Sequence, residues 1–155
     1  MKKLILLLFI ILSVNCYSQQ KDSSLTYIEF SLNNLSTTGP ILKNISPTVE
    51  IGKQWDVFSL GFVIGTIQGN PFIEARPNLN VFQQGKFTNT LTPGIGIRYN
   101  SVQPILMEFT SGIEYSYSKS IHYNINFGQW FFNGKNQSSN SVFIGFSFTK
   151  FFLKK

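Results

Sequence analysis

From Leu25 onward, most of the chain alternates between apolar and polar side chains with a period of two residues. Between Thr26 and Leu32 the even positions are mainly apolar and the odd positions polar, and the stretch from Ile73 to Val81 alternates just as clearly. A strand points successive side chains to opposite faces. The alternation therefore predicts strands that have one apolar and one polar face.

Turn-forming residues divide the alternating region into eight such strands. Gly, Asn, Ser, Gln and Lys concentrate in the short stretches between them, and no segment carries a helical period. About 9–11 residues are enough for a tilted strand to cross a bilayer. The predicted strands span residues 25–34, 46–55, 57–66, 71–82, 87–99, 104–117, 120–132 and 141–152.

The two predicted faces differ in charge and in side-chain size. One face is mainly apolar and carries no charge, except for Lys53 and Lys150 near strand ends, where a lysine can extend to the membrane interface. The other face carries the charged residues and the glycines that lie well inside strands. These are Glu29, Glu50, Glu74, Arg76, Arg98, Glu108 and Glu114, with Gly52, Gly61, Gly65, Gly94, Gly96, Gly112, Gly128 and Gly145.

This segregation predicts an all-β fold, an eight-stranded antiparallel up-and-down transmembrane β-barrel with a polar, glycine-rich lumen. Eight strands enclose a space that side chains just fill, so inner glycines would make room for long Glu and Arg side chains. The alternative is a secreted soluble β-barrel that turns its apolar face inward around an apolar ligand. A soluble surface wants about 25–35% charged residues, whereas this chain has 13%.

The first residues have the features of a secretory signal peptide. Lys2 and Lys3 precede an apolar run over residues 4–14, which is shorter than the roughly 20 residues of a spanning helix. Cleavage after Ser18 is expected, so residues 1–18 are the signal peptide and residues 19–155 one outer-membrane barrel domain. In the alternative, Cys16 is the acylated first residue of a lipoprotein, although Asn15 is large for that processing.

The closing segment from Gly145 to Phe152 is rich in aromatic residues, with four phenylalanines. Together with the strand pattern, it resembles small eight-stranded outer-membrane β-barrel proteins of Gram-negative bacteria, over essentially all of residues 25–152. Lys150 and the residues after Phe152 depart from that family's pattern. The resemblance implies an outer-membrane location and recognition of the C-terminal strand by the barrel assembly machinery. It implies no single activity, because members include structural, adhesion and defence proteins and occasional lipid enzymes.

The inward charged residues are expected to form a structural polar network, because buried charges persist only when paired and hydrogen-bonded. We expect Arg98 to meet Glu108 across one hairpin, and Glu114 to lie near Asn124 or His122 across the next. Five inward glutamates face two arginines, which predicts either protonated carboxyls or water in the lumen and a narrow path for cations. The candidate network is Glu29, Glu50, Glu74, Arg76, Arg98, Glu108, Glu114, His122 and Asn124.

Catalysis, a cofactor and a metal are not expected from these residues. His122 is the single histidine, its position in the alternation points it into the lumen, and the serine nearest to it on that face, Ser120, lies at the turn where the strand starts. A lipid-modifying hydrolase, which needs His, Ser and a carboxylate together, remains the enzymatic alternative. One histidine without a cysteine in the mature chain offers no metal-ligand cluster.

The net charge of +6 falls to +4 once Lys2 and Lys3 are removed, and the other lysines are scattered over turns and tails. A nucleic-acid partner would need a clustered basic face. The scattered lysines are therefore expected to contact outer-membrane lipid headgroups instead.

Pro77 and Pro93 could face each other on adjacent strands and predict a bulge there. The expected role is structural or surface-interacting, for a monomer with both termini and the short turns on the periplasmic side.

Overall fold

The computed structural model describes residues 24–35, 45–135 and 137–153, and all of its regular elements are β-strands. The predicted signal peptide and Cys16 lie outside the described residues. The strands are β1 (Ser24–Leu35), β2 (Ile45–Trp55), β3 (Phe58–Ile67), β4 (Asn70–Gln84), β5 (Phe87–Arg98), β6 (Ile105–Ser118), β7 (Ile121–Asn133) and β8 (Ser138–Phe152). The eight predicted strands are therefore all present.

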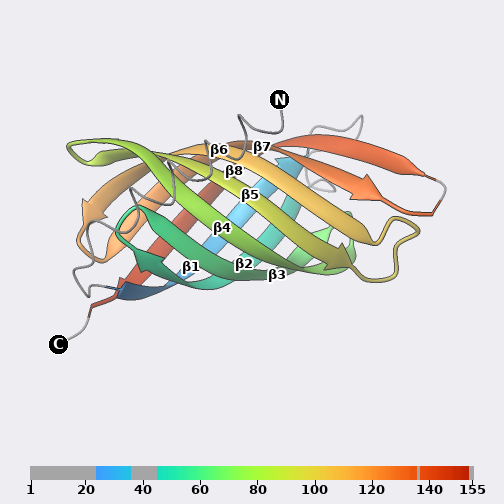
Figure 1. The fold of residues 1–155 in the computed structure, drawn as a ribbon, viewed down its shortest axis with the longest axis horizontal. Coiled ribbons are helices and arrows are strands. Elements are labelled where there is room, and N and C mark those ends of the chain that lie inside the picture. Colours follow the sequence, from blue (N-terminus) through green and yellow to red (C-terminus); the bar gives the residue numbers. More distant parts are fainter. Residues whose placement is uncertain (1–23, 36–44, 136, 154–155) are drawn as a thin grey trace, which may run out of the picture.

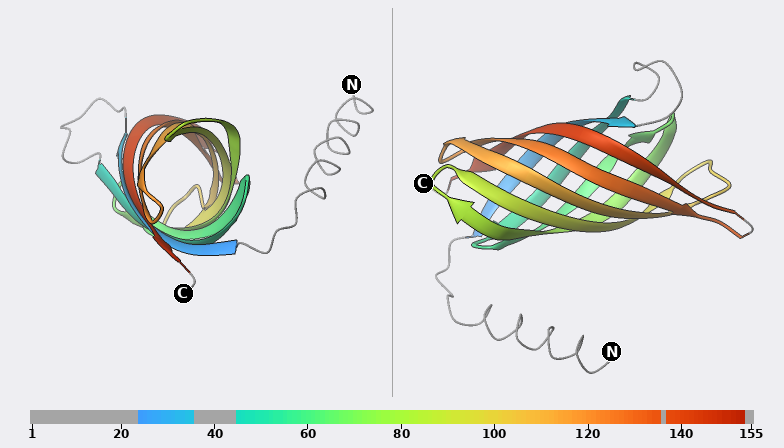
Figure 2. Two further views of the ribbon diagram at one scale, coloured as in Figure 1. Left: turned by 90° about the vertical axis from the view of Figure 1, so that its left-hand side faces the viewer. Right: turned by 90° about the horizontal axis from the view of Figure 1, so that it is seen from above.

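Each strand pairs in antiparallel fashion with the next, and β8 pairs with β1 to close the barrel. Figure 1 shows the barrel from the side, and the left view of Figure 2 looks along the lumen into the closed ring. Closure leaves no strand with unpaired backbone groups at an edge. In a bilayer this satisfies every backbone donor and acceptor within the wall.

The two ends of the barrel differ in their connections. The turn end joins β2 to β3, β4 to β5 and β6 to β7, through residues 56–57, 85–86 and 119–120. The loop end carries the connections 68–69, 99–104 and 134–137. Gln68 and Gly69 both have positive φ, 52° and 79°, as a two-residue hairpin turn of type I′ requires.

β8 begins at Ser138, earlier than the predicted start at residue 141. The polar run Ser138–Asn140 resembles a loop in the sequence, but these residues pair with Asn133, Phe132 and Phe131 of β7. The partner strand thus extends β8 over residues that carry no strand signal of their own. The β7–β8 hairpin consequently projects at the loop end (Figure 1).

The outer wall is apolar, as the alternation predicts. Phe62, Ile125 and Ile95 expose 66%, 63% and 62% of their surfaces. Trp55, Tyr99, Tyr117 and Phe131, which the sequence places near strand ends, are exposed on the same wall. The Lys53 ammonium lies 5.7 Å from the Trp55 ring centroid, so this outward lysine is held near a strand end.

The described residues contain no helix long and apolar enough to cross a membrane.

The predicted bulge is displaced along the strand. The register of β4 and β5 pairs Ala75 with Ile95 and Leu79 with Leu91, so it is the same on both sides of the two prolines. It shifts instead between Asn80 and Phe82. Pro77 keeps its place opposite Leu60 of β3, and Pro93 opposite Phe109 of β6. Each proline is therefore accommodated without an extra residue, and the curvature change lies nearer the turn end.

Candidate functional site in the barrel lumen

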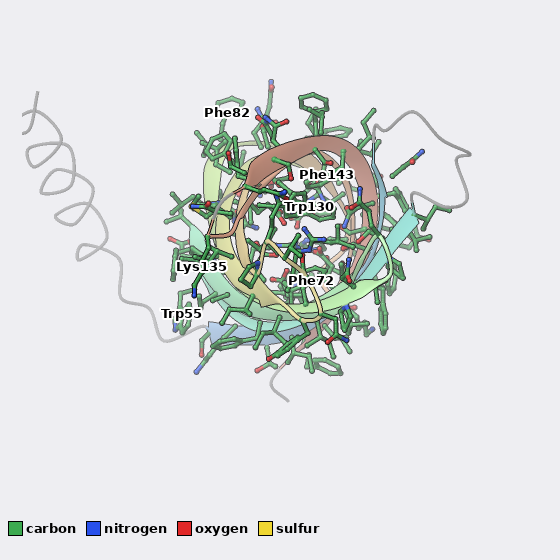
Figure 3. The ribbon with its side chains drawn as sticks, turned by 90° about the vertical axis from the view of Figure 1, so that its right-hand side faces the viewer. Trp55, Phe72, Phe82, Trp130, Lys135 and Phe143 are labelled. Carbon is green, nitrogen blue, oxygen red and sulfur yellow. The ribbon has the colours of Figure 1, made fainter. Side chains whose placement is uncertain are left out.

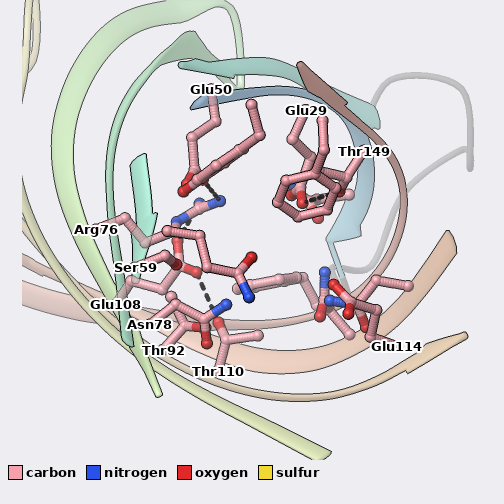
Figure 4. Close-up of a pocket in the computed structure, with 17 residues that line it drawn as sticks. Glu29, Glu50, Ser59, Arg76, Asn78, Thr92, Glu108, Thr110, Glu114 and Thr149 are labelled. Atoms are coloured by element: carbon pink, nitrogen blue, oxygen red, sulfur yellow. Dashed lines mark hydrogen bonds and ion pairs between the residues drawn. The ribbon is translucent and has the colours of Figure 1, made fainter. Parts of the chain in front are cut away.

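One guanidinium and three carboxylates meet in the middle of the lumen, and we call them the ion cluster: Arg76, Glu50, Glu74 and Glu108. Arg76 Nη1 lies 3.1 Å from Glu50 Oε2, and Arg76 Nη2 lies 2.8 Å from Glu108 Oε2 and 3.5 Å from Glu74 Oε2. None of the four residues is more than 7% exposed. β2, β4 and β6 supply them, so the cluster joins opposite parts of the wall (Figure 4).

Neutral donors extend the ion cluster, although Glu74 Oε1 and Arg76 Nε have no hydrogen-bond partner among the described residues. The Tyr27 hydroxyl donates to Glu50 Oε1, Thr110 Oγ1 donates to Glu108 Oε1 at 2.7 Å, and Trp130 Nε1 donates to Glu108 Oε2 at 2.5 Å. Hydrogen bonds to an ionised acceptor are about twice as strong as neutral ones. They offset part of the cost of placing three carboxylates beside one guanidinium away from water.

The inner glycines make room for this cluster, as the sequence predicts. A Cβ at Gly61 would overlap the Glu50 side chain, and one at Gly94 would overlap the Glu74 carboxylate. Gly61 stands opposite Arg76 in the register of β3 and β4. The long charged side chains therefore lie over wall positions that have no side chain of their own.

A second polar group lies closer to the turn end. His122 Nδ1 is 2.9 Å from Glu114 Oε1, and Asn124 stands opposite Glu114 in the register of β6 and β7. Glu29 accepts hydrogen bonds from Ser31 at 3.0 Å and from Thr149 at 2.7 Å. The His122 ring packs against Phe151, with the ring centroids 4.6 Å apart. These side chains bond one another in the lumen, away from the outer wall.

Arg98 faces the lumen but does not reach Glu108, contrary to the expected pairing. The register of β5 and β6 places Gly94 opposite Glu108, so Arg98 lies four residues further toward the loop end. That offset is about 13 Å along a strand at 3.3 Å per residue. The Arg98 guanidinium instead lies over the Phe132 ring, 4.2 Å from its centroid.

Within the polar lumen, the half that leads to the loop end also contains an apolar layer. Seven buried apolar side chains from β3, β4, β6, β7 and β8 pack there. We call this group the apolar plug: Val63, Ile67, Phe72, Leu106, Trp130, Phe132 and Phe143. Figure 3 shows Trp130, Phe143 and Phe72 inside the ring of strands, with Trp55 and Phe82 outside it.

The only sequence feature that could have located the apolar plug is the position of its residues in the two-residue alternation. Trp130 and Phe132 share the face of Asn124 and Gly128, and Phe143 shares the face of Gly145. Each is an apolar residue at an inward position, so both faces of a strand are apolar near the loop end. Such short stretches lack alternation, and alternation was the pattern that defined the inner set.

Around the ion cluster, the lumen leaves little internal space. A cavity of about 30 Å³ lies beside the ion cluster, lined largely by polar residues that include Glu29, Glu50, Arg76 and Glu108 (Figure 4). That volume admits about one or two water molecules. Over the part of the chain that is described, no group of three or more His, Cys, Asp or Glu residues is arranged to hold a metal ion.

A closed wall with an apolar exterior and a filled, partly charged interior defines the class of small eight-stranded membrane β-barrels. The structure is similar to Neisserial surface protein A (NspA), with a TM-score of 0.55 and 10% identity over 83% of this chain and 97% of that one. It is also similar to the de novo designed barrel TMB2.3, with a TM-score of 0.56 and 12% identity over 84% and 97% of the two chains.

A further structure from the de novo design of transmembrane β-barrels has a TM-score of 0.55 and 15% identity, over 84% of this chain and 99% of that one. No protein-family model and no curated protein sequence matches the chain. At these identities the likeness shows the fold, which is that of a transmembrane β-barrel.

Proposed function

We propose that the protein is an outer-membrane β-barrel of a Gram-negative bacterium, monomeric and non-catalytic, with a structural or surface-interaction role. One observation carries this proposal. The outer wall is apolar around the barrel, while the lumen is filled by the ion cluster and the apolar plug. Such a molecule sits in lipid and presents its loop end to the outside.

The packing of the lumen favours a closed barrel over the cation path that the acidic inner face suggests. Trp130 stacks on Phe143 with 4.3 Å between ring centroids and meets Phe72 at 6.2 Å. An apolar constriction disfavours water, and ions with it. The polar cavity behind the plug is too small for a hydrated pathway.

Two alternatives receive less support. A soluble carrier needs a charged exterior, whereas Phe62 and Ile125 are more than 60% exposed on the wall. A lipid-modifying hydrolase needs its catalytic group near the lipid-facing surface. His122 instead points inward, with Nδ1 on Glu114 and its ring against Phe151.

Outer-membrane lipid and the barrel assembly machinery are the proposed partners, and no nucleic acid is among them. β8 would be the segment that the machinery recognises. Phe146 and Phe152 are exposed on its outer face, and the strand ends at Phe152. Loss of the terminal aromatic in Phe152→Ala should slow insertion, whereas Phe82→Ala on β4, also an exposed aromatic, should not.

Cell fractionation with gel electrophoresis of unheated samples tests location and fold together. We expect the protein in the outer-membrane fraction, with a mobility that shifts on boiling. A soluble periplasmic protein without a shift would overturn the proposal. Mass spectrometry of the mature chain decides between cleavage after Ser18 and acylation at Cys16.

Planar-bilayer recording tests the closed lumen. The wild-type barrel should show no steady conductance, and the double variant Trp130→Gly, Phe143→Gly should conduct if the apolar plug is the barrier. Steady cation current through the wild type would contradict a closed barrel. Loss of acyl chains or sugars from lipid A on overexpression would instead favour the hydrolase.

A further inference from the structure

The loop end of the lumen opens into a polar recess of about 550 Å³, which we call the vestibule. Its wall includes Asn70, Asn100, Gln103, Ser139 and Ser141, and Arg98 is the one charged residue among the described residues that line it. The apolar plug lies beneath, because Phe132 belongs to both. The vestibule is thus a recess that is open at the loop end, bounded below by the apolar plug, and lined by hydroxyl, amide and guanidinium groups.

Arg98 is held in the vestibule with unused hydrogen-bonding capacity. The residue is only 5% exposed, and its guanidinium lies over the Phe132 ring of the apolar plug. With the Asn70 amide turned so that its oxygen faces the guanidinium, that oxygen accepts from Nη2 at 3.3 Å while the amide nitrogen donates to the Asn100 carbonyl at 3.2 Å. Arg98 Nε is buried and finds no partner within the described residues.

Among the described residues, no carboxylate lines the vestibule beside Arg98. The connections at that end, residues 36–44, 68–69, 99–104 and 134–137, contain no Asp or Glu and include Lys43 and Lys135. Glu108, which the sequence suggested as the partner, is bonded to Arg76, Thr110 and Trp130. A nearly buried guanidinium with a neutral amide as its partner leaves a charge unpaired, which is costly unless something else pairs with it.

We propose that the vestibule binds an acidic sugar, whose carboxylate or phosphate pairs with Arg98. The planar guanidinium suits two parallel bonds to either oxyanion. A volume of about 550 Å³ is far larger than a bare anion needs and lies within the range of roughly 300–1,000 Å³ typical of ligand pockets. The amides and hydroxyls of Asn70, Gln103 and Ser139 supply donors and acceptors for ring hydroxyls. This inference rests on the proposed function in one respect, that the loop end faces outward.

Binding to the purified, folded barrel in detergent micelles tests the site. Glucuronate and glucose 6-phosphate are the probes, neutral glucose is the control, and the ¹⁵N signal of the Arg98 Nε–H reports occupancy. Both acidic sugars should bind saturably and shift that signal. Glucose should bind at least about tenfold more weakly, because charge-assisted bonds are roughly twice as strong as neutral ones.

Arg98→Gln should weaken binding of the acidic sugars at least about tenfold, while Lys135→Gln, which removes the same charge from the exposed hairpin, should change it less than about twofold, as an exposed charge acts weakly. Arg98→Lys keeps the charge but loses the planar guanidinium, so its affinity for the acidic sugars should lie between those of the other two variants. It replaces Arg98→Gln in the test if that variant does not fold. A mobility that shifts on boiling verifies that each variant is folded. Lipopolysaccharide added in mixed micelles, competing with glucuronate, distinguishes a membrane glycolipid from a soluble sugar.

Equal affinity for glucose and glucuronate, or unchanged binding in Arg98→Gln, would overturn the proposal. So would the absence of saturable binding for either acidic sugar. These binding measurements do not depend on the cellular compartment. They can therefore contradict the ligand proposal while fractionation supports the outer-membrane location, or support the ligand proposal while fractionation contradicts that location.

Discussion

The ion cluster and the apolar plug fill one lumen by different physical means. In the ion cluster, one guanidinium joins carboxylates of β2, β4 and β6, and glycines clear the space above the wall. In the apolar plug, aromatic rings fill the same cross-section without a charge. The middle of so narrow a barrel can therefore be filled by paired charges or by packed rings, and the two sections differ only in the forces that hold them.

Trp130 joins the two regions. Its ring stacks on Phe143 in the apolar plug, while its Nε1 donates to Glu108 in the ion cluster. Glu108 therefore receives a bond from each side, from Arg76 at 2.8 Å and from Trp130 at 2.5 Å. The following variants separate charge pairing from packing.

Arg76→Met should have the largest effect, because it leaves three buried carboxylates without a cation. Breaking a buried pair in this way costs about 3–5 kcal/mol. Urea unfolding in lipid vesicles, followed by far-ultraviolet circular dichroism, measures the loss. The double variant Arg76→Met, Glu108→Gln should recover part of it. An Arg76→Met midpoint equal to that of the wild type would mean that the cluster is not paired as described.

Phe143→Ala tests the apolar plug by removing a ring that is 1% exposed and stacks on Trp130. We expect a loss of about 3 kcal/mol, at the lower end of the range for a buried aromatic, because Phe143 also lines the small polar cavity, from which water can enter the space left by the ring. Trp130 fluorescence should shift to longer wavelength. Phe146→Ala, in the same strand but 52% exposed on the outer wall, is the matched control. Equal losses for the two variants would contradict a packed plug.

Trp130→Phe keeps an aromatic ring in the apolar plug and removes the donor to Glu108. A hydrogen bond to a charged group is worth about 1.5–3 kcal/mol, so we expect a loss near the middle of that range. Circular dichroism is the measurement, since the change also removes a fluorophore. Trp55→Phe on the outer wall should be close to neutral. A neutral Trp130→Phe would show that packing alone holds this residue.

Ser147→Ala should have the smallest effect and the opposite sign. Ser147 Oγ is buried and has no hydrogen-bond partner within the described residues. Since an unsatisfied buried hydroxyl is unfavourable, its removal should leave stability unchanged or raise it by up to about 1 kcal/mol. Thr110→Val, which loses the 2.7 Å bond to Glu108, is the control and should destabilise. A marked loss in Ser147→Ala would reveal a bonded hydroxyl.

Local pattern predicted the strands and most of the inner face because both depend on side-chain alternation. Glu50, Glu74, Arg76 and Glu108 lie inside, and the inner glycines lie under long side chains. Pairings between strands were harder to predict. Arg98 was expected to meet Glu108, but a register set by the 99–104 connection moved the two apart. Arg76 meets Glu108 across the lumen instead, although the two residues belong to strands that are not neighbours.

Period and composition were enough to predict that this chain forms strands, that eight of them close, and which face meets lipid. The contacts between inward side chains came only from the folded structure, because strand tilt and register bring together residues that are far apart in the chain. That structure placed the apolar plug at the loop end, where inward aromatic residues interrupt the alternation. It also separated Arg98 from Glu108, the partner that the sequence suggested, and left that guanidinium in the vestibule.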